Sequence, residues 1–134
     1  MRPTNLLTTY LVEDSAVIRE NLIATLEELA PVRVVGTSGD EGSALRWLAS
    51  HEVDLVIVDL FLKGGSGLGV LRAVHHGEND LRRVVLSNYA TDAMRLRCLE
   101  LGADGVFDKS TEIDALLHYC NELAQHKSAP GSIN

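Results

Sequence analysis

Short runs of apolar residues alternate along the chain with longer segments in which apolar residues recur every three or four positions. Runs that are rich in Val, Leu and Ile, with little polar alternation, are typical of strands buried on both faces, as in a parallel sheet. The longer segments have the spacing of amphipathic helices. The expected strands are Leu6–Val12, Val32–Val35, Asp54–Val58, Arg83–Leu86 and Gly105–Phe107.

Apolar stripes predict five helices between and after these strands, over residues 18–29, 44–48, 68–74, 94–99 and 113–123. Side chains that can accept hydrogen bonds from a helix N-terminus precede four of them: Asp14 or Ser15, Ser66, Thr91 and Ser110. Glycines suited to a helix end follow the third and fourth, at Gly77 and Gly102.

Alternating strands and helices predict an α/β fold, a single doubly wound sheet of five parallel strands flanked by five helices. We expect one domain over residues 1–126 and a frayed polar tail over 127–134. We expect no output domain within this chain, because few residues follow the fifth helix.

Composition narrows the class of protein. The chain has 134 residues, and 12 Lys and Arg against 19 Asp and Glu give a net charge of −7. This balance argues against direct nucleic-acid binding or an anionic membrane partner. No apolar run approaches the roughly 18 residues of a membrane span, and residues 1–9 do not resemble a signal peptide. Cys98 and Cys120 form no metal-binding or disulfide pattern. We therefore expect a cytoplasmic domain.

The candidate chemistry stands directly after the expected strands. Glu13 and Asp14 follow the first strand, Asp59 the third, Ser87 the fourth and Lys109 the fifth. In an open parallel sheet these carboxyl ends meet at one edge, where ligands bind. Neighbouring carboxylates repel each other and favour a cation, and oxygen ligands suit Mg²⁺. Lys109 adds a positive charge and Ser87 a hydroxyl donor, and both can bind an anion. Together with the carboxylates, these are the groups that phosphoryl transfer requires.

In these motifs the chain resembles a bacterial two-component response-regulator receiver domain of the chemotaxis-receiver type, over about Thr8 to His126. The motifs are Val12-Glu13-Asp14-Ser15, Val58-Asp59-Leu60, Gly65-Ser66-Gly67-Leu68, Val85-Leu86-Ser87, and Gly102-Ala103-Asp104-Gly105 leading to Lys109. Each motif alone is weak, but five in order at five expected strand ends are specific. The resemblance implies the strand order 2-1-3-4-5.

The resemblance also implies the role of each site residue. Asp59 would accept the phosphoryl group, Ser87 would donate a hydrogen bond to it and Lys109 would pair with it. The implied Mg²⁺ ligands are Asp14, Glu13 largely through water, Asp59 and the backbone carbonyl of Phe61. The implied partners are a sensor histidine kinase or phosphotransfer protein and a downstream effector protein, and a homodimer would use the face of the fourth helix, fifth strand and fifth helix.

Several positions depart from the family pattern. Val106 stands where an aromatic residue is usual, and Phe107 cannot replace it because successive strand residues face opposite sides. Ser110 replaces the proline that commonly follows the lysine, so we expect a trans Lys109–Ser110 peptide bond. The proline usual after the acceptor is also absent, within Lys63-Gly64-Gly65. Phe61 and Tyr89 would stand at the mouth of the site and shield a phosphoaspartate from water.

Two functional hypotheses remain. The first is a receiver that catalyses its own phosphorylation and dephosphorylation, and is not a metabolic enzyme. The alternative is a phosphorylation-independent interaction module on the same fold. A dehalogenase-type hydrolase is a distant third, because that class needs a second Asp where Phe61 stands. The presence of Glu13, Asp14 and Asp59 favours the first hypothesis, since a module without phosphoacceptor chemistry would not need carboxylates that repel each other.

Overall fold

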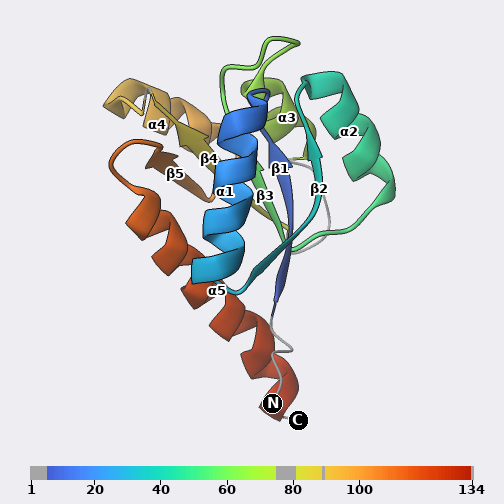
Figure 1. The fold of residues 1–134 in the computed structure, drawn as a ribbon, viewed down its shortest axis with the longest axis vertical. Coiled ribbons are helices and arrows are strands. Elements are labelled where there is room, and N and C mark those ends of the chain that lie inside the picture. The colour runs from blue at the N-terminus through green and yellow to red at the C-terminus, as the bar shows by residue number, and fades with distance from the viewer. Residues whose placement is uncertain (1–5, 75–80, 89, 134) are drawn as a thin grey trace.

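The computed structural model describes residues 6–74, 81–88 and 90–133, the last seven of these by their backbone alone. Strands and helices alternate through these residues (Figure 1). The elements are β1 (Leu7–Val12), α1 (Ala16–Leu29), β2 (Val32–Ser38), α2 (Glu41–Ser50), β3 (Leu55–Val58), α3 (Gly67–Val74), β4 (Arg82–Ser87), α4 (Asp92–Glu100), β5 (Gly105–Asp108) and α5 (Ile113–Ile133). The strands are parallel in the order β2-β1-β3-β4-β5, which confirms the expected fold.

The sheet is covered on both faces, which explains why its central strands lack polar alternation. Leu11 and Ile57 lie on the face that packs against Leu22 and Leu26 of α1 and against Leu116 of α5. The opposite face packs against α2, α3 and α4, and Figure 1 shows α1 and α5 on the other side of the strands from them. The carboxyl ends of all five strands therefore open at one edge between the two helix layers.

The observed helix ends test the predicted N-cap residues and terminating glycines. The side chain of Ser15 accepts from Ile18 N and that of Thr91 from Met94 N, so both predicted N-caps are confirmed. Gly102 follows α4 with φ +106°, the left-handed conformation expected of a terminating glycine. The predicted cap at Ser110 is wrong, because α5 begins at Ile113. Gly77 lies outside the described residues.

Two other boundaries differ from the prediction. Strand β2 continues to Ser38 rather than ending at Val35, because as an edge strand it alternates after Val32 between exposed and partly buried positions and needs no apolar run. Helix α5 continues to Ile133, so the backbone of 127–133 is helical where fraying was expected, and a domain boundary at residue 126 stays a prediction. Within the described residues, no helix combines the length and apolar character needed to cross a membrane.

Candidate functional site

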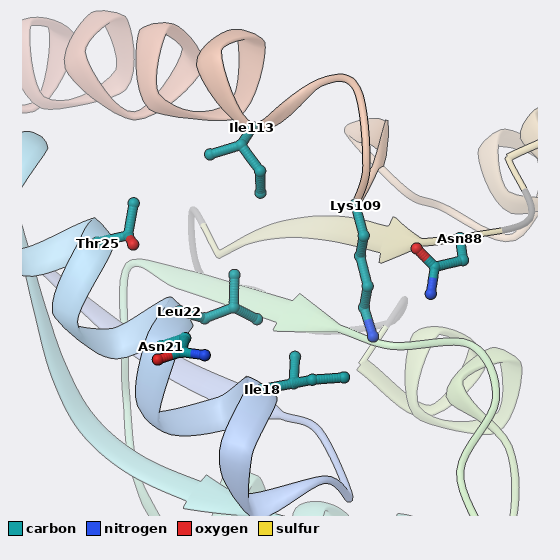
Figure 2. Close-up of a pocket in the computed structure, with 7 residues that line it drawn as sticks. All are labelled: Ile18, Asn21, Leu22, Thr25, Asn88, Lys109 and Ile113. Atoms are coloured by element: carbon teal, nitrogen blue, oxygen red, sulfur yellow. The ribbon is translucent and has the colours of Figure 1, made fainter.

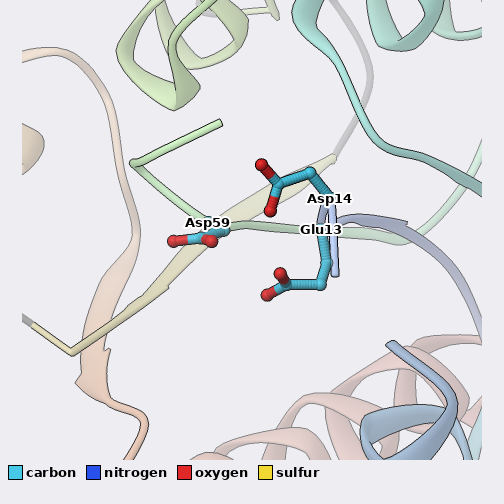
Figure 3. Close-up of side chains that lie close together, drawn as sticks. All are labelled: Glu13, Asp14 and Asp59. Carbon is cyan, nitrogen blue, oxygen red and sulfur yellow. The ribbon is translucent and has the colours of Figure 1, made fainter. Parts of the chain in front are cut away.

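Three carboxylates meet where β1 and β3 end (Figure 3). Glu13, Asp14 and Asp59 each have a carboxylate oxygen within 4.8 Å of the others. Only 1% of Glu13 and 8% of Asp59 are exposed, and Asp14 is half-buried. Sequence reasoning placed these groups together, and the structure confirms their proximity. Two buried carboxylates this close require positive charge to remain ionised.

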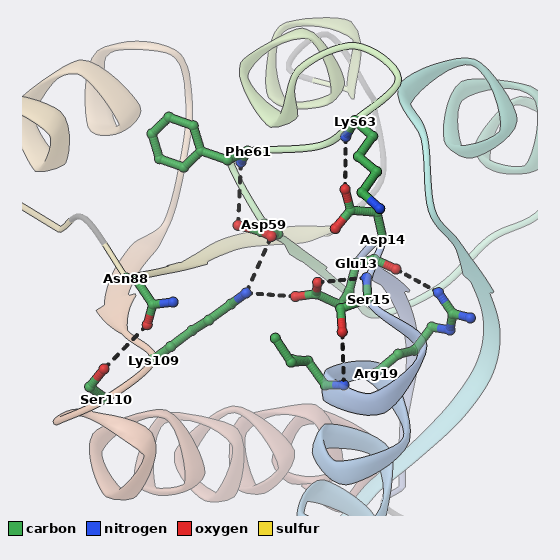
Figure 4. Close-up of polar contacts among 11 residues, drawn as sticks. Glu13, Asp14, Ser15, Arg19, Asp59, Phe61, Lys63, Asn88, Lys109 and Ser110 are labelled. Atoms are coloured by element: carbon green, nitrogen blue, oxygen red, sulfur yellow. Dashed lines mark hydrogen bonds and ion pairs between the residues drawn. The ribbon is translucent and has the colours of Figure 1, made fainter.

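Lys109 supplies positive charge from the end of β5 (Figure 4). Its Nζ lies 2.7 Å from Oε1 of Glu13 and 3.2 Å from Oδ2 of Asp59. The side chains of all three are at least 89% buried, since the exposed fractions are 11%, 2% and 10%. One ammonium group thus serves two carboxylates, with the shorter contact to Glu13.

Backbone donors hold the carboxylates in place. Ser15 N donates to Oε2 of Glu13 at 3.0 Å, and Lys63 N donates to Oδ2 of Asp14 at 2.8 Å. Phe61 N donates to Oδ1 of Asp59 at 3.3 Å. The loop after β3 therefore contacts two of the three carboxylates through its own N–H groups (Figure 4).

Burial sets the ionisation of the site. Burial raises the pKa of Asp59 above its usual value, opposed by the charge of Lys109 and reinforced by that of Glu13. The pKa of Lys109 is also raised: burial lowers it, but the hydrogen bond to Glu13 and the charges of both carboxylates outweigh burial. The ionised Asp59 is therefore poorly compensated in the folded protein without a second cation.

We expect Asp59→Asn to stabilise the protein near pH 7 when divalent cations are chelated. Because the folded pKa of Asp59 exceeds its ordinary 3.8, the folded state binds the proton more tightly than the unfolded state. The wild type then loses stability as pH rises from about 3.8 through the folded pKa. Urea unfolding across this range should show the variant's advantage growing with pH and then levelling. An advantage that does not vary with pH would contradict this account.

The remaining site residues predicted from sequence lie around this cluster. Ser87 is buried at the end of β4, and its carbonyl accepts a hydrogen bond from Lys109 N at 3.0 Å. Phe61 follows β3 and is 53% exposed, and Tyr89 lies outside the described residues. The Lys109–Ser110 peptide bond is trans, as predicted.

The donor set fits Mg²⁺. Glu13, Asp14 and Asp59 offer three carboxylate oxygens within reach of one ion, and Mg²⁺ prefers oxygen ligands and retains waters. Within the described residues, this is the cluster of carboxylate, imidazole or thiol groups that could hold a metal. The carbonyl of Phe61, two residues beyond Asp59, would be a further ligand. The Lys109 ammonium contacts two of these carboxylates and would compete with the metal ion for them.

A pocket of about 280 Å³ adjoins the site between α1 and the start of α5 (Figure 2). Its lining residues are Ile18, Asn21, Leu22, Thr25, Asn88, Lys109 and Ile113. Ligand pockets begin at about 300 Å³, so this hollow is small for a bound cofactor. The Lys109 stem forms one wall, which places the pocket beside the carboxylates.

Sequence reasoning missed a polar network on the α4 side of β5. The guanidinium of Arg95 donates to the carbonyls of Ala90 at 3.0 Å and Val106 at 2.9 Å, and binds Oε1 of Glu112 at 2.8 Å. Val106 packs towards α4 and Phe107 towards α5, as alternation predicted. A guanidinium contact therefore joins the loop after Ser87 to β5 and to the residues before α5. No local sequence signal marks such a contact.

Comparisons with known proteins agree with this geometry. The family model described as the response regulator receiver domain matches residues 9–121. Response regulator UvrY of Escherichia coli (strain K12) is 24% identical over 104 residues, which are 78% of this chain and 48% of that protein. The DNA-binding transcriptional activator DevR/DosR of Mycobacterium tuberculosis is 29% identical over 96 residues, 72% of this chain and 44% of that protein. Protein-glutamate methylesterase/protein-glutamine glutaminase 5 of Myxococcus xanthus is 32% identical over 127 residues, 92% of this chain and 36% of that protein. The chain thus spans half or less of these relatives.

Solved structures share the fold. The signal receiver domain of the putative response regulator NarL from Mycobacterium tuberculosis superposes with a TM-score of 0.79 at 24% identity, covering 90% of this chain and 97% of that one. A response regulator from Burkholderia pseudomallei, described with a phosphorylated aspartic acid, calcium ion and citrate, gives a TM-score of 0.73 at 23% identity, covering 95% of this chain and 74% of that one.

Proposed function

Because the chain belongs to the response regulator receiver domain family, we propose that Asp59 accepts a phosphoryl group from a histidine kinase or a phosphotransfer protein in a Mg²⁺-dependent reaction. The observation that carries the proposal is the meeting of three carboxylates with the Lys109 ammonium at one edge of the sheet. A purely structural site would gain nothing from burying two carboxylates around one cation.

The proposed reaction is an in-line phosphoryl transfer to Asp59. A carboxylate oxygen of Asp59 attacks the phosphorus of the donor's phosphohistidine. The O–P bond forms as the P–N bond breaks, and the bonding electrons stay on the imidazole, whose other nitrogen carries the proton that makes it a neutral leaving group. Mg²⁺ bound by Glu13, Asp14, Asp59 and the Phe61 carbonyl would neutralise charge on the transferred group.

Lys109 and Ser87 would hold the product. The Lys109 ammonium, already 3.2 Å from Asp59, pairs with a phosphoryl oxygen, and the Ser87 hydroxyl donates a hydrogen bond to another. A movement of Ser87 towards the phosphoryl group would be passed along the chain to Ala90, whose carbonyl accepts a hydrogen bond from Arg95. The added charge would thereby change the face formed by α4, β5 and α5, as in other phosphorylation switches.

The same face is the proposed signalling surface. Leu96 and Leu99 of α4 are 59% and 51% exposed. An effector protein or a second copy of the chain would cover them in the cytoplasm. The net charge of −7 argues against DNA binding by this domain itself. The relatives are named for different functions, one as a DNA-binding transcriptional activator and another as a protein-glutamate methylesterase/protein-glutamine glutaminase, so the output of the whole protein is a separate proposal.

Incubation with a small acyl phosphate tests the proposal. We expect intact-mass measurement to show one phosphoryl group per chain in the presence of Mg²⁺ and none with chelator, because the carboxylates need a cation to accept further negative charge. Asp14→Asn should raise the Mg²⁺ concentration needed for half-maximal labelling by about tenfold or more.

Two results would contradict the proposal. Absence of labelling at saturating Mg²⁺ would favour the phosphorylation-independent interaction module. Labelling with an unchanged Mg²⁺ midpoint in Asp14→Asn would show that the metal binds elsewhere. Asp92→Asn, which alters a carboxylate in the first turn of α4 away from the cluster, serves as the matched control.

A further inference from the structure

The glycine-rich segment after β3, residues 64–69, closes around a carboxylate from a different helix. Glu41 begins α2, and its Oε1 accepts a hydrogen bond from Ser66 N at 2.9 Å. Its own N donates to the carbonyl of Gly64 at 2.9 Å. Figure 1 shows α2 beside α3. The carboxylate thus lies at the N-terminus of α3, where negative charge is favourable.

Two of the glycines leave space for the Glu41 side chain in the place where it lies. Gly65 has φ +103°, and a Cβ there would lie 2.6 Å from both Cβ and Oε1 of Glu41. A Cβ on Gly69 would collide with Oε2 of Glu41. The segment that could suggest a phosphate-binding loop is therefore shaped around an anion of its own chain.

The loop that leads into this segment, residues 61–63, carries backbone donors of the acidic site. Phe61 and Ser66 pair across the loop as an isolated antiparallel bridge, so fixing Ser66 also fixes Phe61. Lys63, between them, donates its N–H to Asp14. Glu41 thus anchors the loop at Gly64 through its backbone and at Ser66 through its side chain.

We propose that Glu41 is a positioning residue for Mg²⁺ binding and phosphoryl acceptance, acting through the loop of residues 61–66. It does not touch the reacting atoms. It holds the Phe61 carbonyl and the Lys63 N–H where the metal ligands need them. This inference rests on the proposed function, because it assumes that Mg²⁺ binds at Glu13, Asp14 and Asp59.

Calorimetric titration of Mg²⁺ tests the role of the carboxylate. We expect Glu41→Ala to weaken Mg²⁺ binding about tenfold, the size of effect typical of residues that orient metal ligands. Glu41→Gln keeps an acceptor oxygen for Ser66 N and should retain most of the affinity. Glu52→Ala, at an exposed glutamate just after α2, is the matched control and should leave affinity unchanged. Unfolding in chelator is measured in parallel. A fall in unfolding temperature with unchanged Mg²⁺ affinity would overturn the proposal.

A double-mutant cycle tests whether Gly69 and Glu41 act together. Gly69→Ala alone should weaken Mg²⁺ binding about as much as Glu41→Ala, because its methyl group displaces the carboxylate. The double variant should be no weaker than Glu41→Ala alone, since the methyl then has space. Fully additive losses would overturn the proposal.

Labelling separates this inference from the proposed function. Wild type that is not labelled at Asp59 would overturn the proposed function. Wild type that is labelled, with Glu41→Ala and Gly69→Ala matching it in both Mg²⁺ affinity and labelling rate, would overturn the role of Glu41 alone.

Discussion

Asp59→Asn is expected to abolish phosphoryl labelling of the chain. Among the clustered carboxylates, Asp59 is the one that follows the central strand β3, and the Lys109 ammonium that would pair with the product contacts it at 3.2 Å as well as contacting Glu13. An amide is a far weaker nucleophile than a carboxylate, so no residual rate is expected at this position. Intact-mass measurement after incubation with a small acyl phosphate and Mg²⁺ provides the readout.

Controls for this experiment come from the other two carboxylates. Glu13→Gln and Asp14→Asn keep the acceptor and should still be labelled when Mg²⁺ is raised, because they alter metal binding rather than the attacking oxygen. The Asp59→Asn protein should remain folded, as the burial of that carboxylate makes its ionised form unfavourable. Labelling that survives in folded Asp59→Asn would place the acceptor at another residue.

The fold could be predicted because the central strands are buried on both faces. Leu55–Val58 is uniformly buried, and such a run is visible in the sequence without knowledge of its neighbours. The N-caps at Ser15 and Thr91 could also be predicted from the sequence. In each, the side chain accepts a hydrogen bond from the backbone N–H three residues later. Parallel topology then brings the strand ends together.

The misplaced cap before α5 shows the limit of such local signals. Ser110 was favoured as a cap by residue type, but its N–H donates to Oδ1 of Asp108 and its hydroxyl to Oδ1 of Asn88. Glu112 accepts the first helical hydrogen bond of α5 through its carbonyl, from Leu116 N. Several polar residues in succession could each have started the helix, and the contact with the β4–α4 loop decides among them.

Contacts between distant elements were not predictable. Glu41 and Ser66 are 25 positions apart, and Arg95 and Glu112 are 17 apart. Neither pair follows a helical or strand period, so hydrophobic patterning gives no signal for it. The glycines at positions 64–69 were visible, but as a turn and cap, because the carboxylate they enclose belongs to another helix.

Lys109→Met is expected to make stability depend strongly on Mg²⁺. The substitution keeps the apolar stem but leaves Glu13 and Asp59 buried without their shared cation. Removing one partner of a buried ion pair typically costs about 3–5 kcal/mol, so the free energy of unfolding in chelator should fall by about that much. Lowering the pH should restore part of it, because protonation removes the repulsion between the carboxylates.

Mg²⁺ should then bind the variant more tightly than the wild type, because the ammonium that competes for the carboxylates is gone. Saturation at about one hundred times the dissociation constant contributes about 2.7 kcal/mol, enough to recover much of the loss. Lys63→Met is the matched control, since Lys63 is exposed and contacts Asp14 through its backbone N–H. Urea unfolding with chelator and with Mg²⁺ measures both effects. Equal stability of Lys109→Met and wild type in chelator would mean that the carboxylates do not depend on this cation, and Lys109 would then serve only the phosphorylated state.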